Sequence, residues 1–508
     1  MSYLRFDKAQ MTNLEDSLKK EILRSNRSGA YSCTTLVGCN TRKYHGLLVV
    51  PVPELDDENH VLLSSLDATV IQHGAEFNLG LHKYQGNNFS PRGHKYIREF
   101  DSLQVPTTLY RVGGVLLRRE EVFQHFSNRV IIRFTLVEAH SATTLRLQPF
   151  LAFRSVREFT HENGAASRDY QEVKNGIKTC MYAGYPDLYM QLSKKNEFVF
   201  RPDWYRGLEY PKEQERGYQG QEDLYVPGYF EFTIKKGESV IFSAGLDEAD
   251  PKKLPELAEF EVNVRTPRDT FYHNLVNSAH QFIVHRDHGD YVLAGYPWFK
   301  CRARDMFISL PGLTITNGEF DKFESVIATA EKGIREFMEG EPLSVKIYEM
   351  NQPDVLLWAV WCIQQYGKLT DMQTVIKKYG KLVEDIMEYI RLGNHPGIEV
   401  RDNGLLYAPG GQDRALTWMN SQANGKPIVP RSGYIVEVNA LWYNCLMFSA
   451  EICRVMKDEP VEQMLLEAAE KTKAGFLEVF MNQHGYLLDY VDGNMMDWSV
   501  RPNMIFPV

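Results

Sequence analysis

The sequence predicts a multidomain β + α fold, in which an N-terminal β-sandwich over residues 1–249 is joined by a connector over 250–267 to a helical domain over 268–508. Two observations predict this organisation. The spacing of apolar residues changes near residue 250 from alternation to a helical period, and the helices that follow are of two kinds. A chain of 508 residues is long enough for two or three domains of this type.

The first half of the chain carries many short strand-like segments. Apolar residues alternate over 130–136 and again over 144–153. Turn pairs recur at Gly113-Gly114, Asn163-Gly164, Asn175-Gly176 and Lys236-Gly237. Many short strands separated by regular turns are typical of a sandwich. The following stretch contains Asp-Pro, Leu-Pro and Thr-Pro steps, which disfavour continuous structure and predict the connector.

The second half contains helices with one apolar stripe and helices that are apolar nearly all round. Residues 320–337, 372–390 and 441–455 each present one apolar face, whereas 355–363 is apolar on most sides. A helix of the latter kind must be buried on most of its surface, so the alternation predicts an inner and an outer layer. About seven helices are expected after residue 268. They do not complete a double ring, and the apolar end at 505–508 predicts that the chain is truncated at its C-terminus.

The composition excludes several classes of function. The net charge is −9 and no basic stripe occurs, so we expect no nucleic-acid partner and a neutral substrate. No apolar run reaches the roughly 18 residues needed to span a membrane. The seven cysteines form no CxxC pair, and the N-terminus lacks an apolar signal segment, which together predict reduced thiols and a cytoplasmic protein.

Motifs for common cofactors and metals are missing from the sequence. It has no GxxxxGK[ST] loop, no GxGxxG opening a helix, no HExxH and no GxSxG. His285 and His288 flank Asp287 in a loop rich in Gly and Asp, which favours a surface turn over a metal site. The sequence therefore predicts neither a cofactor nor a metal, and it leaves the oligomeric state open.

Carboxylates and aromatic residues gather at the starts of predicted helices. Trp298, Arg304 and Asp305 form the first cluster, in which a ring could stack on a sugar and the charged groups could bind hydroxyls. The alternative is a helix start with a salt-bridged arginine and a buried tryptophan. Asp354 lies in the first turn of an apolar helix, where it either complements the helix dipole or is kept protonated by burial.

Two further clusters have the same character. Each one alone could cap and pack a helix, but in a ring of helices the entries converge on one cavity mouth. The residues of interest are Trp418, Asn420, Glu437 and Asn439 in the third cluster, and Asp497 and Arg501 in the fourth.

Several motifs occur in the order typical of one family. The sequence resembles the amylo-α-1,6-glucosidase branch of the glycogen debranching enzyme family. The motifs that carry the resemblance are R-K-Y-H-G-L-L at 42–48, W-Y-R-G-L-E-Y at 204–210, G-Y-P-W-F…R-D at 295–305, D-x-x-L-W at 354–358, T-W-M at 417–419, V-E-x-N-A-L-W-Y-N at 436–444 and D-x-x-x-R-P-N at 497–503.

The resemblance implies a β-sandwich followed by a glucoamylase-like (α/α)6 barrel, incomplete at the C-terminus. It also implies inverting hydrolysis of the α-1,6-linked glucosyl stubs of glycogen or a related branched α-glucan. Asp354 matches the proposed general acid and Asp497 the proposed base, with carboxyl groups roughly 6.5–9.5 Å apart. Glu437 is the reserve catalytic carboxylate. The residues expected to hold the sugar are Trp298, Arg304, Asp305, Trp418, Asn420, Glu437, Asn439 and Arg501.

The sequence departs from the family pattern at two places. Lys300–Ala303 replaces a Thr-Asp-Trp-Gly stretch, and Asn420 stands where the family has an aspartate. These changes motivate a rival hypothesis, a catalytically weak α-glucan-binding or regulatory protein. A third is a glycosidase or phosphorylase for another oligosaccharide on the same scaffold. The Tyr44-His45-Gly46 motif is expected either to build a packing turn or to contribute a glucan-contacting wall.

Overall fold

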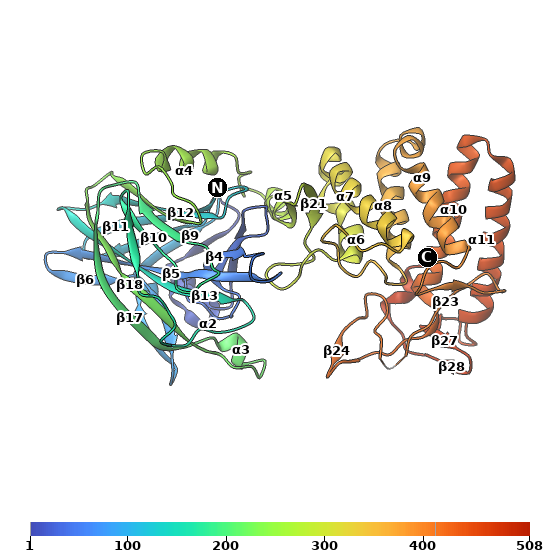
Figure 1. The fold of residues 1–508 in the computed structure, drawn as a ribbon, viewed down its shortest axis with the longest axis horizontal. Coiled ribbons are helices and arrows are strands. Elements are labelled where there is room, and N and C mark those ends of the chain that lie inside the picture. The colour runs from blue at the N-terminus through green and yellow to red at the C-terminus, as the bar shows by residue number, and fades with distance from the viewer. Residues whose placement is uncertain (1, 412, 508) are drawn as a thin grey trace. The chain divides into compact units, whose positions relative to one another are not determined.

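The computed structural model describes residues 2–411 and 413–507 of the chain (Figure 1). It has two compact units, Met1–Arg286 and Asp287–Val508. The first is built mainly of strands and the second mainly of helices, as the change of period near residue 250 predicts. The division lies later in the chain than the predicted boundaries at 249 and 268, because two helices after residue 250 belong to the first unit.

Two large antiparallel sheets make up the first unit. In the described residues, one sheet has the strand order β1 (Arg5–Asp7), β9 (Ile97–Asp101), β10 (Thr107–Val112), β11 (Val115–Phe123), β12 (Arg129–Glu138), β19 (Ser239–Gly245), β16 (Leu188–Leu192), β15 (Gly176–Thr179) and β14 (Tyr170–Val173). The other has the order β2 (Glu21–Ser25), β3 (Tyr31–Thr35), β4 (Gly46–Pro51), β5 (Asn59–Gln72), β13 (Thr143–Ser155), β18 (Gln221–Ile234), β17 (Glu197–Glu209), β7 (Leu81–Tyr84) and β8 (Asn88–Arg92), with β6 (Ala75–Asn78) paired to β5.

The hydrophobic core of this unit draws on both sheets. Phe134 of β12 and Phe242 of β19 come from one sheet, and Leu147 of β13 and Phe230 of β18 come from the other. All four side chains are fully buried. Along the first half of β13 the buried and half-buried positions alternate, which is the pattern of a strand with one face on a core. The predicted sandwich is confirmed.

The predicted connector contains a helix that packs on the sandwich. Helix α4 (Leu254–Asn263) begins just after Pro251 and has Pro255 in its first turn, where proline is tolerated. Its buried residues Leu254, Ala258 and Val262 form a small second core with sheet residues such as Ile131 and Ile241. Proline therefore marks the start of a helix here. Short helices α1 (Lys8–Thr12), α2 (Leu14–Ser17) and α3 (Pro211–Gln214) and the longer α5 (Phe271–Phe282) complete the unit.

The second unit consists of helices in two layers. Its helices among the described residues are α6 (Ala303–Leu313), α7 (Phe320–Glu339), α8 (Val355–Leu369), α9 (Met372–Arg391), α10 (Val436–Met456) and α11 (Glu459–Phe480). Helices α6, α8 and α10 are neighbours, and α8 and α10 are buried over most of their surface. Helices α7 and α9 bury one face only. The two predicted layers are thus present, and Figure 1 shows the helices side by side.

Short strands occupy the long loops of the helical unit. A small sheet has the order β22 (Glu399–Val400), β23 (Leu406–Ala408), β26 (Gly433–Ile435), β27 (Tyr490–Asp492) and β28 (Met495–Met496). A hairpin of β24 (Gln422–Ala423) and β25 (Lys426–Pro427) lies in one of these loops, β21 (Gly289–Val292) begins the helical unit, and β20 (Ile283–Arg286) ends the first unit. Strands β26 and β27 pair, which brings the start of α10 close to the segment that leads to the predicted motif at 497–503. In the described part of the chain no helix is long and apolar enough to cross a membrane.

Candidate active site

Asp354 lies at the start of α8, where two other helix residues bind its carboxylate. Arg304, the second residue of α6, donates from Nε to Oδ2 at 2.7 Å and from Nη2 to Oδ1 at 2.8 Å. Trp358, one turn along α8, donates from its indole nitrogen to Oδ2 at 3.1 Å. Asp354 is only 1% exposed. The structure therefore brings together two of the predicted site residues, Arg304 and Asp354.

Arg304 and Asp354 form a buried pair joined by two hydrogen bonds. Burial lowers the pKa of Arg304, but the charge and hydrogen bonds of Asp354 outweigh burial and raise it. Two parallel bonds to one guanidinium are the strongest arrangement such a pair can adopt. Oδ1 of Asp354 accepts one bond from Arg304, and a carboxyl oxygen has two lone pairs, so Oδ1 retains a position at which a general acid would carry its proton.

An exposed group of aromatic rings lies in the segments that flank this pair. Trp298, Phe299 and Tyr348 are each more than a third exposed. The guanidinium of Arg302 lies 4.5 Å from the centre of the Phe299 ring. The ammonium of Lys300 lies 5.5 Å from that of Tyr348. The Lys300–Ala303 departure thus places two cations on aromatic faces.

A second cluster of charges is buried at the start of α10. Arg431 donates two parallel bonds to Glu437, at 2.5 Å from Nη1 to Oε1 and at 2.7 Å from Nη2 to Oε2. The Nε atom of Arg431 lies 3.0 Å from Oδ2 of Asp489. Arg431 and Asp489 are fully buried and Glu437 nearly so. Both oxygens of Glu437 are thus used inside the protein in this conformation.

Asp489 also organises the predicted fourth cluster. Arg501 donates to Asp489 at 2.8 Å and to Asp497 at 2.5 Å, and Asn503 donates to Asp489 at 2.6 Å. The indole of Trp418 donates to Asn503 at 2.7 Å. Three predicted residues, Trp418, Asp497 and Arg501, are therefore joined through Asp489 and Asn503. Neither of these two residues is among the predicted site residues, although Asn503 belongs to the R-P-N motif.

Asp497 is the more accessible of the two proposed catalytic carboxylates. Its side chain is 16% exposed. Burial raises its pKa, but the bonds from Arg501 and Ser499 outweigh burial and hold the pKa below the usual value. The backbone N–H of Ser499 donates to Oδ1 at 2.9 Å. A carboxylate of this kind stays ionised at mildly acid pH and can accept a proton from water.

The remaining predicted residues lie in different environments. Asn439 is fully buried, and its amide bonds to the backbone of Leu406 and Ile435. It therefore ties α10 to β23 and presents no group to a ligand in this conformation. Asp305 is exposed in the first turn of α6, and Asn420 is half-buried in the loop before β24.

Trp358 contacts both Asp354 and the segment that follows Arg501. Its indole nitrogen bonds to Asp354, and its ring lies 5.7 Å, edge to face, from the ring of Phe506. Phe506 follows the short helix η3 (Pro502–Ile505), which contains Asn503 and contacts α10. The loop that carries Arg501 and Asn503 thus ends against the same tryptophan that binds Asp354.

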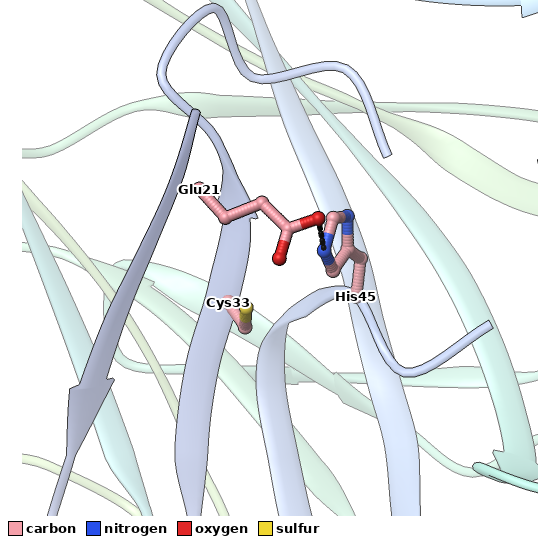
Figure 2. A group of neighbouring side chains, drawn as sticks. All are labelled: Glu21, Cys33 and His45. Carbon is pink, nitrogen blue, oxygen red and sulfur yellow. Dashed lines mark ion pairs between the residues drawn. The ribbon is translucent and has the colours of Figure 1, made fainter. Parts of the chain in front are cut away.

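One group of potential metal ligands lies in the first unit. Candidate ligand atoms of Glu21, Cys33 and His45 are within 4.8 Å of one another (Figure 2). The backbone N–H of Thr41 donates to Nδ1 of His45, so Nε2 carries the proton and faces the Glu21 carboxylate at 3.6 Å. A protonated nitrogen has no lone pair for a metal. Arg42 already binds Glu21 at 2.7 Å.

Glu21 behaves as the anionic partner of this group. Burial raises its pKa, but the bonds from His45 and Arg42 outweigh burial and lower the pKa to about 2. Burial lowers the pKa of His45, which keeps the imidazole neutral. The arrangement fits a hydrogen-bonded turn that closes the Tyr44-His45-Gly46 motif. The absence of a metal from this protein stays a prediction.

Comparison with known proteins identifies the class to which a chain with these two units belongs. Residues 20–241 match the family model described as glycogen debranching enzyme N terminal, and residues 277–508 match the one described as amylo-alpha-1,6-glucosidase. The chain belongs to the glycogen debranching enzyme family. The predicted family and the predicted enzyme class are confirmed, and the protein is a glycosidase of α-glucans.

The fold also resembles a solved structure. A bacterial glucoamylase complexed with acarbose matches with a TM-score of 0.50 and 11% sequence identity, over 92% of this chain and 68% of the glucoamylase. This likeness concerns the fold and supports the predicted glucoamylase-like (α/α)6 architecture. Comparison with curated protein sequences gives no match.

Proposed function

We propose that the protein hydrolyses α-1,6-linked glucosyl stubs of glycogen or a related branched α-glucan with inversion, using Asp354 as acid and Asp497 as base. The observation that supports the proposal is the position of Trp358, whose indole binds Asp354 and whose ring packs on Phe506, in the segment that follows Asp497. The match of residues 277–508 to the amylo-alpha-1,6-glucosidase family supports the choice of linkage.

The proposed reaction uses the two carboxyl groups in different protonation states. The acid transfers its proton to the glycosidic oxygen as the bond to the anomeric carbon breaks. The base removes a proton from a water molecule that attacks the opposite face of the ring, so the product is β-glucose. In this reaction Oδ1 of Asp354, which accepts one bond from Arg304, carries the proton on its remaining lone pair.

The linkage and stereochemistry are tested on a limit dextrin. The full chain is expected to release glucose whose first NMR signal is that of the β-anomer. Release of α-glucose would contradict inversion, and absence of glucose would contradict the function.

Hydrolysis rates on α-glucosyl fluoride, whose leaving group needs no proton, distinguish the role of the acid from that of the base. Asp354→Asn is expected to lower hydrolysis of the dextrin by about 10²–10⁴-fold while leaving the fluoride largely active. Asp497→Asn is expected to impair both substrates, because both need activated water. Asp402→Asn, at an exposed turn, is the matched control and should change neither rate. Equal losses on both substrates for Asp354→Asn would remove its role as acid.

A second candidate is an α-glucan-binding protein with weak catalysis. It is favoured by one observation, the occupation of both Asp354 oxygens by Arg304. It predicts retardation of the protein in gels that contain glycogen, with no release of glucose.

A further inference from the structure

The β-sandwich unit contains an open cleft of about 600 Å³ that the proposed reaction does not use. Its floor is formed where β5 begins and β13 ends, by His60, Phe153 and Arg154. Its sides are the loops that follow β13 and β15, which supply Tyr182 and Tyr185. The volume lies in the range of about 300–1,000 Å³ that is typical of small-ligand sites. All of these residues belong to the first unit.

The aromatic side chains of the cleft are held in place by polar contacts. The hydroxyl of Tyr185 lies 2.9 Å from Nδ1 of His60, and Nε2 of His60 lies 3.0 Å from Asp56. Tyr185 packs edge to face on Phe153, with ring centres 5.5 Å apart. Burial raises the pKa of Tyr185 to about 12, so its hydroxyl remains a donor at neutral pH. The ring of Tyr185 is thus pre-organised by its neighbours.

Tyr182 lies beside this network and is half-buried. Its ring centre is 6.4 Å from that of Tyr185, and its hydroxyl accepts a bond of 2.8 Å from Asn163. Two adjacent tyrosine rings with polar tips provide apolar faces and hydroxyl groups in one wall. A sugar ring, which has an apolar face and a polar rim, matches this combination.

The charges of the cleft favour a neutral ligand. Arg154 is bound to the buried Glu222 below the floor. Arg157 lies 3.5 Å from Glu58 and donates to the hydroxyl of Tyr44 at 3.1 Å. Both arginines of the cleft therefore have carboxylate partners within the first unit. The polar groups that line the cleft suit hydroxyl groups instead.

We propose that this cleft is a non-catalytic binding site for a neutral oligosaccharide, with Tyr182 as the stacking residue. The choice of an α-glucan chain as the occupant rests on the proposed function. Such a site would hold an outer chain of a branched polymer on the β-sandwich unit.

The proposal is tested on the full chain by native electrophoresis in gels that contain glycogen. Tyr182→Ala is expected to raise the dissociation constant for glycogen about tenfold, and Tyr182→Phe, which retains the ring, is expected to restore it. Tyr189→Ala is the matched control, because Tyr189 is a half-buried tyrosine of β16 outside the cleft. Hydrolysis of isomaltose, a disaccharide, should be the same in all four proteins.

A second measurement needs no variant and does not depend on how Tyr182→Ala folds. Maltoheptaose is expected to protect the segments 157–163 and 182–185 of the wild-type protein from hydroxyl-radical oxidation. Lack of protection, or equal retardation of Tyr182→Ala and wild type, would overturn the proposal.

The outcomes separate this site from the proposed function. Retardation that depends on Tyr182, without any glucose release, would support the cleft and contradict the hydrolase. Glucose release, together with equal retardation of Tyr182→Ala and wild type in glycogen gels, would support the hydrolase and contradict the binding site in the cleft.

Discussion

Asp489 is a fully buried carboxylate on which two arginines and one asparagine converge. Arg431, Arg501 and Asn503 all bind it, so its removal takes a carboxylate partner from each of these side chains and leaves the arginines only Glu437 and Asp497. Loss of one member of a buried ion pair typically costs about 3–5 kcal/mol. We therefore expect Asp489→Ala to lower the free energy of unfolding of the helical unit by about that amount, measured by urea titration of the helical circular dichroism.

The control for Asp489 is Asp402→Ala, at an exposed turn, which should change stability by less than about 0.5 kcal/mol. An Asp489 variant as stable as the control would show that the cluster contributes no net stability.

Arg501 sets the acidity of the proposed base. Its bond to Asp497 helps to hold the pKa of that carboxylate below the usual value, against the opposite effect of burial. In Arg501→Gln the favourable charge is lost, so the pKa of Asp497 rises and the carboxylate becomes protonated at a higher pH. The acid limb of the kcat/KM profile on limit dextrin is therefore expected to move to higher pH.

The comparison variant for Arg501→Gln is Ser499→Ala, which retains the backbone N–H bond from residue 499 to the Asp497 carboxylate. It should move the acid limb in the same direction by a smaller amount. An unchanged limb in Arg501→Gln would indicate that another group controls it.

At the residue scale, the sequence predicts individual site residues but not the side chains that bind them. The R-D and D-x-x-L-W motifs predicted Arg304 and Asp354 as site residues. Their bond to each other could not be predicted, because the two residues are 50 positions apart in the sequence. Asp489 lacked a local signal, since a lone Asp after two leucines resembles any strand entry. Its role arises only when β26 and β27 pair and bring Arg431 to it.

Helix α4 shows how an element can be hidden in a proline-rich segment. Its buried Leu254 packs with sheet residues in a small core. Truncation of a buried leucine typically costs about 2–5 kcal/mol. Leu254→Ala is therefore expected to lower the stability of the β-sandwich unit by about 2 kcal/mol or more, measured by urea titration of Trp204 fluorescence.

The control for this helix is Val264→Ala, since Val264 is about half exposed and lies at the helix end. It should be nearly neutral. Equal effects of the two changes would mean that α4 is not part of the sandwich core.

At the scale of elements, the spacing of apolar residues predicted the helices of the second unit correctly, both those that bury one face and the one that is buried on most sides. The stripes over 320–337 and 372–390 and the apolar run over 355–363 lie in α7, α9 and α8. Periodicity failed at α4 because three Pro steps suggested a break, whereas Pro255 occupies the first turn, where no hydrogen bond is lost. Proline alone therefore does not distinguish a linker from a helix start.

The two units differ in how far apart in the sequence their contacts lie. In the sandwich, β12 pairs with β19, which begins 100 residues after β12 ends. In the helical unit, consecutive helices such as α10 and α11 pack on each other. Long-range pairing slows folding, because a long loop must close before contacts form. The sandwich is therefore expected to refold more slowly than the helices.

The chain offers a probe for this difference. Trp204 is the one tryptophan of residues 1–286, and it is buried in β17 beside Tyr225. After dilution from urea, the helical circular dichroism should recover first, followed by a slower phase of fluorescence. Trp204→Phe should remove the slow phase, whereas Trp361→Phe, in α8, should retain it. A single common rate for both signals would contradict independent folding of the two units and would mean that the sandwich and the helices form one cooperative structure.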